Sequence, residues 1–200
     1  MDFFAIEYID GYLSRNKKLF LIAISIFIFG CIVGVIWGYI SVGGKTGQIT
    51  LTFLNSSPDV FDYRGNALNL FIHNLFADLI IYAGAFLFSI ISVGCILYNA
   101  VSISIPFGQD FVFAFLSIVP HGIFEYSSSI LSLVGAFLIT KMEIHYIKLL
   151  LGKSSDFDVG MAIKDLALTF SVNMVLLLIA AFVEAYFTPM VISLFFWGVI

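Results

Sequence analysis

The sequence predicts an all-α protein that crosses a membrane several times. Of its 200 residues, 61% are hydrophobic and only 11% are charged, which is more apolar than the core of a soluble domain requires. Predominantly apolar runs such as 19–40 and 165–185 reach the roughly 20 residues that span a hydrocarbon core. The polar connections between these runs are short, so residues 1–200 are expected to form a single membrane domain.

Lysine and arginine gather in two clusters that predict the orientation of the chain. One cluster lies at 15–18, before the first apolar run, and the other lies around the polar stretch 141–164. Because these residues favour cytoplasmic loops, both clusters and the N-terminus are expected on the cytoplasmic side of the cell membrane. A short loop over 43–66 is then expected outside, and 141–162 is the expected cytoplasmic loop.

The first span is expected over about 19–42, where Gly30, Gly34 and Gly38 recur every four residues. Such a stripe lets a neighbouring backbone approach closely, so it is predicted to be a helix-packing face, either within the bundle or against a second copy. The alternative is that glycines are simply common in membrane helices. The alternating apolar and acidic residues at 2–13 suggest a short separate helix at the cytoplasmic interface.

The next part of the chain contains a possible strand and a long second span. Residues 49–53 alternate with the period of a strand, and an apolar run over about 70–101 is longer than a bilayer requires. The outer half of this run carries His73, Asn74 and Asp78. The first two either sit at the headgroup level or act as ligands, whereas Asp78 lies deeper and is a candidate for a polar core.

The most informative stretch places Pro120, His121, Gly122 and Glu125 inside an apolar run. Ionisable side chains are costly in a membrane and usually face a bundle interior or a cavity. Proline followed by glycine loosens backbone hydrogen bonding, which lipid tolerates only where protein or water satisfies the freed groups. This stretch is therefore expected to be either a functional site or a structural feature on which the fold depends.

The expected topology also requires a helix break here. The run 70–101 should end inside, as should 141–164, so the residues between them must cross an even number of times. A broken or re-entrant helix pair around 106–140 satisfies this requirement, with arms at 106–119 and 121–140. The break is expected at Pro120 and Gly122, and a last span follows at about 163–186.

Five polar residues are predicted to form an intramembrane core: His121, Glu125, Glu184, Asn74 and Asp78. On a helix, His121 and Glu125 lie four residues apart and share one face. They could hydrogen-bond to each other, bind a cation together, relay protons, or cap the ends of a broken helix. Glu184 and Asn74 are the leading partners for Glu125, because each is an isolated polar residue that needs a partner.

Sequence signatures of enzymes are absent. The chain contains no HExxH, GxSxG or GxxxxGK[ST] motif. Cys31 and Cys95 lie in separate apolar runs and no CxxC occurs, so no catalytic residue, metal or cofactor is expected. The sequence contains no basic patch with interleaved aromatic residues, the pattern that would indicate binding to nucleic acid. The expected surroundings are the lipid bilayer and either a membrane-protein partner or a second copy of the chain.

Three segments, in order along the chain, carry a family resemblance. They read FIHNLF at 71–76, PHGIFE at 120–125 and IAAFVEAYFTP at 179–189. Together they resemble the signature segments of the stage II sporulation protein M family, over about residues 65–190. In sporulating bacteria this resemblance implies membership of a membrane complex that acts with peptidoglycan-remodelling enzymes during engulfment. His73 departs from the pattern, since another asparagine is expected there.

The sequence thus predicts a non-enzymatic integral membrane component or scaffold of a membrane complex. The alternative is a transporter or channel subunit that uses the intramembrane residues His121, Glu125 and Glu184, and the third possibility is an intramembrane hydrolase. A polar cavity that reaches a membrane face would favour transport. A metal ion bound between His121 and Glu125 would favour catalysis.

Overall fold

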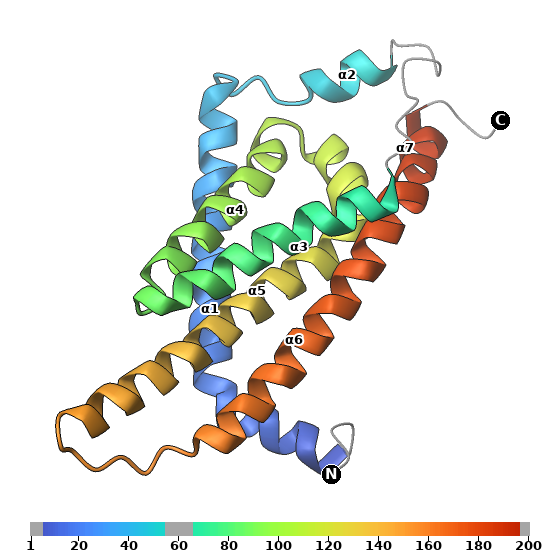
Figure 1. The fold of residues 1–200 in the computed structure, drawn as a ribbon. Coiled ribbons are helices and arrows are strands. Elements are labelled where there is room, and N and C mark those ends of the chain that lie inside the picture. The colour runs from blue at the N-terminus through green and yellow to red at the C-terminus, as the bar shows by residue number, and fades with distance from the viewer. Residues whose placement is uncertain (1–5, 55–65, 197–200) are drawn as a thin grey trace.

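The computed structural model describes residues 6–54 and 66–196, and all regular structure in these residues is helical (Figure 1). Within these described residues, five segments are long and apolar enough to cross a membrane. The predicted all-α, multi-pass membrane fold is confirmed. In chain order the elements are α1 (Ile6–Ser41), α2 (Gln48–Leu54), α3 (Ala67–Ala83), the 3₁₀ turn η2 (Gly84–Leu87), α4 (Ile90–Gln109), α5 (Phe111–Leu150), α6 (Val159–Phe182), the π-helical turn η3 (Val183–Phe187) and α7 (Thr188–Phe196).

The elements form an elongated bundle with two distinct ends (Figure 1). One end holds the start of α1 and the connection between α5 and α6. The other end holds α2, α7 and the tight turn between α4 and α5. Helices α1, α5 and α6 run from end to end, whereas α3 and α4 form a hairpin whose two open ends both lie toward α2 and α7.

The hairpin replaces the single span expected over 70–101. Phe88 and Ser89 adopt left-handed backbone angles, with φ of 53° and 58°, and reverse the chain between η2 and α4. The Ser92 hydroxyl donates a 2.6 Å hydrogen bond to the carbonyl of Ile81, near the end of α3. Such bonds satisfy the backbone at an otherwise apolar turn. Hydropathy cannot distinguish one long span from two helices joined by an apolar turn.

The predicted break at Pro120 and Gly122 is not seen, because α5 is one continuous helix from Phe111 to Leu150. The arms 106–119 and 121–140 are therefore not separate helices. The bend lies at Asp110, whose carboxylate caps α5 by accepting a 3.1 Å hydrogen bond from the Phe113 N–H. Proline removes only one backbone hydrogen bond. A membrane helix tolerates that loss where neighbouring helices or side chains satisfy the freed backbone group.

Other boundaries also differ from the sequence expectations. Residues 49–53 lie in helix α2 rather than in a strand, and α1 is continuous from Ile6, so the described part of 2–13 is not a separate helix. Helix α5 continues to Leu150, which shortens the expected 141–162 loop to 151–158. The final helix begins at Val159 and continues through η3 into α7.

Helices α1 and α4 pack closely along the predicted glycine stripe. Each of Gly30, Gly34 and Gly38 faces α4, and a Cβ atom added to Gly34 would collide with the carbonyl oxygen of Val101. Gly108 of α4 faces α1 in the same way. The structure therefore places this packing face within the bundle.

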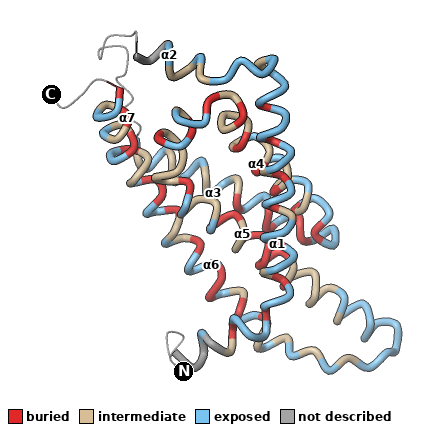
Figure 2. The backbone as a smooth tube through the Cα atoms, turned by 180° about the vertical axis from the view of Figure 1, so that it is seen from behind, coloured by how far each residue is buried: buried red, intermediate tan, exposed pale blue. Residues whose placement is uncertain are grey.

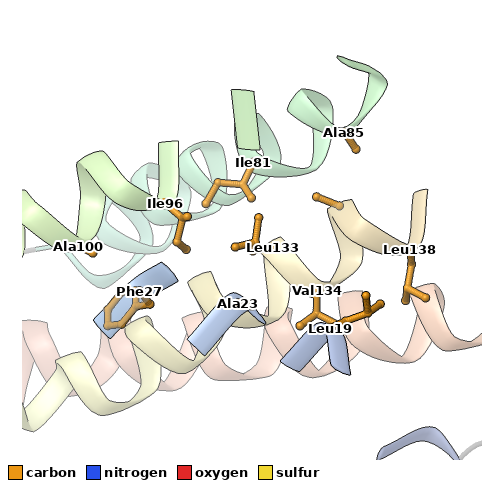
Figure 3. Packing of buried hydrophobic residues seen from close by; sticks show 11 residues of the cluster. Leu19, Ala23, Phe27, Ile81, Ala85, Ile96, Ala100, Leu133, Val134 and Leu138 are labelled. Atoms are coloured by element: carbon orange, nitrogen blue, oxygen red, sulfur yellow. The ribbon is translucent and has the colours of Figure 1, made fainter. Parts of the chain in front are cut away.

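The apolar core lies where α1, the α3–α4 hairpin and α5 meet (Figure 3). Figure 2 shows that buried positions follow the inner faces of the helices, while much of the outer surface is exposed. That outer surface is rich in large apolar side chains, as expected of a surface that faces lipid. The labelled core residues are Leu19, Ala23, Phe27, Ile81, Ala85, Ile96, Ala100, Leu133, Val134 and Leu138.

Candidate functional site

Three of the five predicted core residues meet between α5 and η3. His121, Glu125 and Glu184 each offer one ligand atom, and these atoms lie within 4.8 Å of one another. His121 Nε2 and Glu125 Oε2 are 4.0 Å apart, and their side chains are only 12% and 25% exposed. We call His121, Glu125 and Glu184 the His-Glu-Glu cluster.

The π-helical turn places Glu184 in this cluster. The N–H of Thr188 donates to the carbonyl of Val183, five residues back, which widens the helix locally. Pro189 follows at once and has no N–H to continue an α-helical ladder, so a wider turn suits the sequence there. Single π-turns of this kind occur frequently at functional sites.

Thr188 also fixes the histidine ring. Its hydroxyl oxygen lies 3.2 Å from His121 Nδ1, which is hydrogen-bonding distance. The opposite ring nitrogen, Nε2, faces Glu125. Helix α5 and the η3–α7 segment thus orient the imidazole together.

A cavity of about 290 Å³ borders the cluster. Most of its lining is apolar and comes from the first turns of α5 and from α7, with Ser117, His121, Glu184 and Thr188 as polar members. Its end of the bundle is the end that holds α2 and α7. The lining residues are Phe113, Ser117, Ile118, His121, Glu184, Thr188, Pro189 and Ile192.

Asn74 and Asp78, the other two predicted core residues, are not part of this cluster. The amide nitrogen of Asn74 is buried and has no hydrogen-bond partner among the described residues. Asp78 is 2% exposed, and its carboxylate accepts hydrogen bonds from Ser128 at 2.6 Å and from Ser129 at 3.3 Å. Asp78 therefore belongs to a second polar site, deeper along α5.

Asn173 completes this second site, and sequence reasoning missed it. Its side-chain amide hydrogen-bonds to Ser128 and Ser132 and, at 3.5 Å, to the hydroxyl of Tyr82. The network joins α3, α5 and α6, and we call it the Asp78 network. A lone asparagine in an apolar run was the signal that could have identified it.

A third polar group near the start of α1 was also missed. Arg15 and Asn16 both donate to the carboxylate of Asp165 on α6. Tyr12, one turn before Asn16, and Thr169, one turn after Asp165, share a 2.8 Å hydrogen bond. The basic cluster near the N-terminus indicates the orientation of the chain, and its arginine also pairs with Asp165, the single acid at the start of the last apolar run.

Comparison with known proteins supports the family resemblance. An uncharacterized protein of Methanocaldococcus jannaschii is 26% identical to this chain over 163 residues, which cover 78% of this chain and 88% of the relative. No solved structure matches. The model of the stage II sporulation protein M family matches residues 23–189, which include the His-Glu-Glu cluster and the Asp78 network. The chain therefore belongs to the stage II sporulation protein M family.

Proposed function

We propose that this membrane protein is a non-enzymatic scaffold that binds a partner protein on its cytoplasmic side. The observation that carries this proposal is the end of α5. After Lys141 this helix continues for a further nine residues to Leu150 and projects away from α6 (Figure 1). We call residues 141–151 the α5 arm.

The α5 arm combines polar and exposed apolar side chains. It contains Lys141, Glu143 and Lys148, which disfavour burial in hydrocarbon. Its apolar residues are nevertheless exposed, with Leu150 at 86% and Tyr146 at 54%. Contiguous apolar surface outside a lipid environment is typical of an interaction site.

The charge of the arm indicates the chemistry of the partner. Lys148 is exposed in the arm beside its apolar residues, and Lys153, just after the arm, is also exposed. An amphipathic segment with apolar residues and acidic side chains would therefore complement this surface. Membership of the family, whose name refers to sporulation, is compatible with a role in a membrane complex.

The proposed orientation follows from the positions of the basic residues. The basic residues of 15–18 and of 141–164 lie at the same end of the bundle. The bias of lysine and arginine toward the cytoplasm supports a cytoplasmic N-terminus and a cytoplasmic α5 arm.

The Asp78 network supports a structural rather than a moving core. Its buried polar groups bond to one another across α3, α5 and α6. Satisfied networks of this kind make a core rigid and specify its packing.

Photo-crosslinking in cells tests the scaffold proposal. A photoreactive amino acid at Leu150 should give a discrete protein adduct whose crosslinked peptide is acidic and amphipathic, and Leu149→Asp should abolish it. The same probe at Val175, which is 58% exposed on the apolar α6, is the matched control and should crosslink only to lipid. A lipid adduct alone at position 150 would contradict the proposal.

A transporter or channel subunit is the second candidate, because a cavity borders His121 and Glu184. In proteoliposomes this candidate predicts a proton or cation flux that Glu184→Gln abolishes without loss of folding. The scaffold proposal predicts no such flux.

A further inference from the structure

We propose that His121, Glu125 and Glu184 bind a divalent transition-metal ion, with Zn²⁺ as the best-suited ion. This site does not rest on the scaffold proposal, and a metal ion bound here would favour the intramembrane hydrolase over the scaffold. It also departs from the sequence expectation that no metal binds, because only the folded chain brings Glu184 beside the other two residues.

The distances suit an ion. Zinc bonds to nitrogen and carboxylate oxygen at about 2.0–2.2 Å, so two ligand atoms of one tetrahedral ion lie roughly 3.5 Å apart. His121 Nε2 and Glu125 Oε2 are 4.0 Å apart, so a small side-chain rotation brings them to this spacing. All three ligand atoms lie within 4.8 Å of one another, so rotation of the Glu184 side chain brings the full set into range.

The donor set is that of a zinc site with an open position. One imidazole and two carboxylates give three protein ligands, and zinc sites with three protein ligands keep a fourth position for water or another molecule. The 290 Å³ cavity borders His121 and Glu184 and has room for that molecule. Calcium and magnesium favour all-oxygen sites, so the imidazole selects against them.

The histidine is held as a metal ligand usually is. A ligating imidazole generally uses its second ring nitrogen in a hydrogen bond that fixes the ring. The Thr188 hydroxyl lies 3.2 Å from His121 Nδ1 and leaves Nε2 toward the glutamates. The wider η3 turn places Glu184 and Thr188 on the side of α5 that carries His121.

The charge of the site requires a positive species. Segments 67–140 and 165–196, which build it, contain no lysine or arginine. The ligand atoms of Glu125 and Glu184 lie within 4.8 Å of each other, and the cationic side chains nearest to them in this apolar surrounding are histidines. A bound metal ion supplies that charge, and a shared proton is the competing solution.

Metal binding by the full-length protein in mild detergent tests the site. After removal of metals with EDTA and re-addition of Zn²⁺, the wild type should retain about one ion per chain and unfold at a higher temperature. His121→Asn and Glu184→Gln should each weaken Zn²⁺ binding by more than about tenfold. His145→Asn and Glu143→Gln are matched controls in α5 and should bind like the wild type.

A measurement on the wild type alone covers the case in which a variant does not fold. Co²⁺ should give the visible spectrum of a four- or five-coordinate ion, and Zn²⁺ should displace it. A spectrum of aqueous Co²⁺, or equal Zn²⁺ binding by wild type and Glu184→Gln, would overturn the proposal. Lack of Zn²⁺ binding together with greater stability of Glu184→Gln would instead establish the shared proton.

Discussion

The guanidinium of Arg15 binds the carboxylate of Asp165 with two hydrogen bonds, at 2.6 Å and 3.2 Å. Residues 150 positions apart in sequence thereby join the start of α1 to the start of α6. The carboxylate side chain is 4% exposed and the arginine side chain 35% exposed. Asn16 donates a further hydrogen bond of 2.7 Å to the same carboxylate.

We predict that the two partners of this ion pair differ in their effect on stability. Asp165→Ala leaves Arg15 and the buried Asn16 without their carboxylate and should lower the free energy of unfolding by roughly 3 kcal/mol. Arg15→Ala should cost only about 1 kcal/mol, because its side chain is partly solvated. Thermal unfolding in detergent measures both, with the exposed Lys17→Ala as the control. Equal effects of the three changes would show that the pair does not hold α1 to α6.

Close packing of α1 on α4 is predicted to depend on Gly34. A Leu side chain at this position would meet the α4 backbone at Val101 and should destabilise the protein by about 1–3 kcal/mol, through forced separation of the helices. Gly94→Leu is the matched control, because nothing lies within 4 Å of a Cβ atom added there. If both variants unfold at the wild-type temperature, the stripe plays no part in packing.

The Asp78 network predicts that a buried serine and an exposed serine differ in their effect on stability. Ser128→Ala removes the hydroxyl that links Asp78 to Asn173 and should cost about 1–3 kcal/mol, because buried polar groups lose a partner. Ser127→Ala, one position earlier, removes an exposed hydroxyl that bonds only to the backbone of its own helix. This control should leave the unfolding temperature nearly unchanged. A larger loss for Ser127→Ala would rule out the network as a source of stability.

Asp110 predicts a response of α2 to acid. Burial alone would raise the pKa of its carboxyl, but hydrogen bonds from the Thr50 hydroxyl and N–H and from backbone N–H groups of α5 outweigh burial and hold the pKa below its ordinary value. A lowered pKa stabilises the folded state above the ordinary carboxyl pKa of about 4, and the stabilisation is lost as pH falls through the lowered value. Helix α2 should therefore detach only in strong acid.

Hydrogen exchange of residues 48–54 measures this detachment. Asp110→Asn should increase the hydrogen exchange of residues 48–54 at neutral pH. The detachment of α2 should then no longer depend on acidification, because no carboxylate remains to be protonated. The exposed Asp156→Asn is the control and should behave as the wild type. Unchanged exchange in Asp110→Asn would show that the Thr50 contact does not secure α2.

The α3–α4 hairpin predicts a specific pattern of cysteine labelling. In a background of Cys31→Ala and Cys95→Ala, a cysteine at Lys45 should label only from outside and one at Lys153 only from inside. A cysteine at Phe88 should label from neither side, because the hairpin turn is apolar and its side chains Phe86 and Ile90 are 72% and 73% exposed. Labelling of position 88 from inside would mean that α3 crosses the membrane fully.

Sequence reasoning identified the fold class and part of the candidate site. Long apolar runs with few charges leave the backbone no option but helices in lipid, so the multi-pass helical fold followed from composition. His121 and Glu125 could be placed on one face because a helix repeats every 3.6 residues. The glycine repeat marked a close-packed face for the same reason.

Only the tertiary structure decided where the chain turns and which polar residues meet. Pro120 lies in an uninterrupted helix, while Phe88 and Ser89, which carry no sequence signal for a turn, reverse the chain. Their strained backbone angles are stabilised by contacts from distant residues, including a 2.7 Å hydrogen bond between Ser89 and Thr140. Periodicity along one helix cannot report such contacts.

The same limit applies to the polar partners. The sequence by itself determined that Glu184 and Asp78 each needed a partner in an apolar surrounding, but it did not single out Asp165. How the helices pack side by side decided the partners. Glu184 lies beside His121 and Glu125, Asp78 bonds to serines of α5, and Asp165 bonds to Arg15. Burial makes satisfaction of a polar group obligatory, but the three-dimensional arrangement of the helices selects the group that provides it.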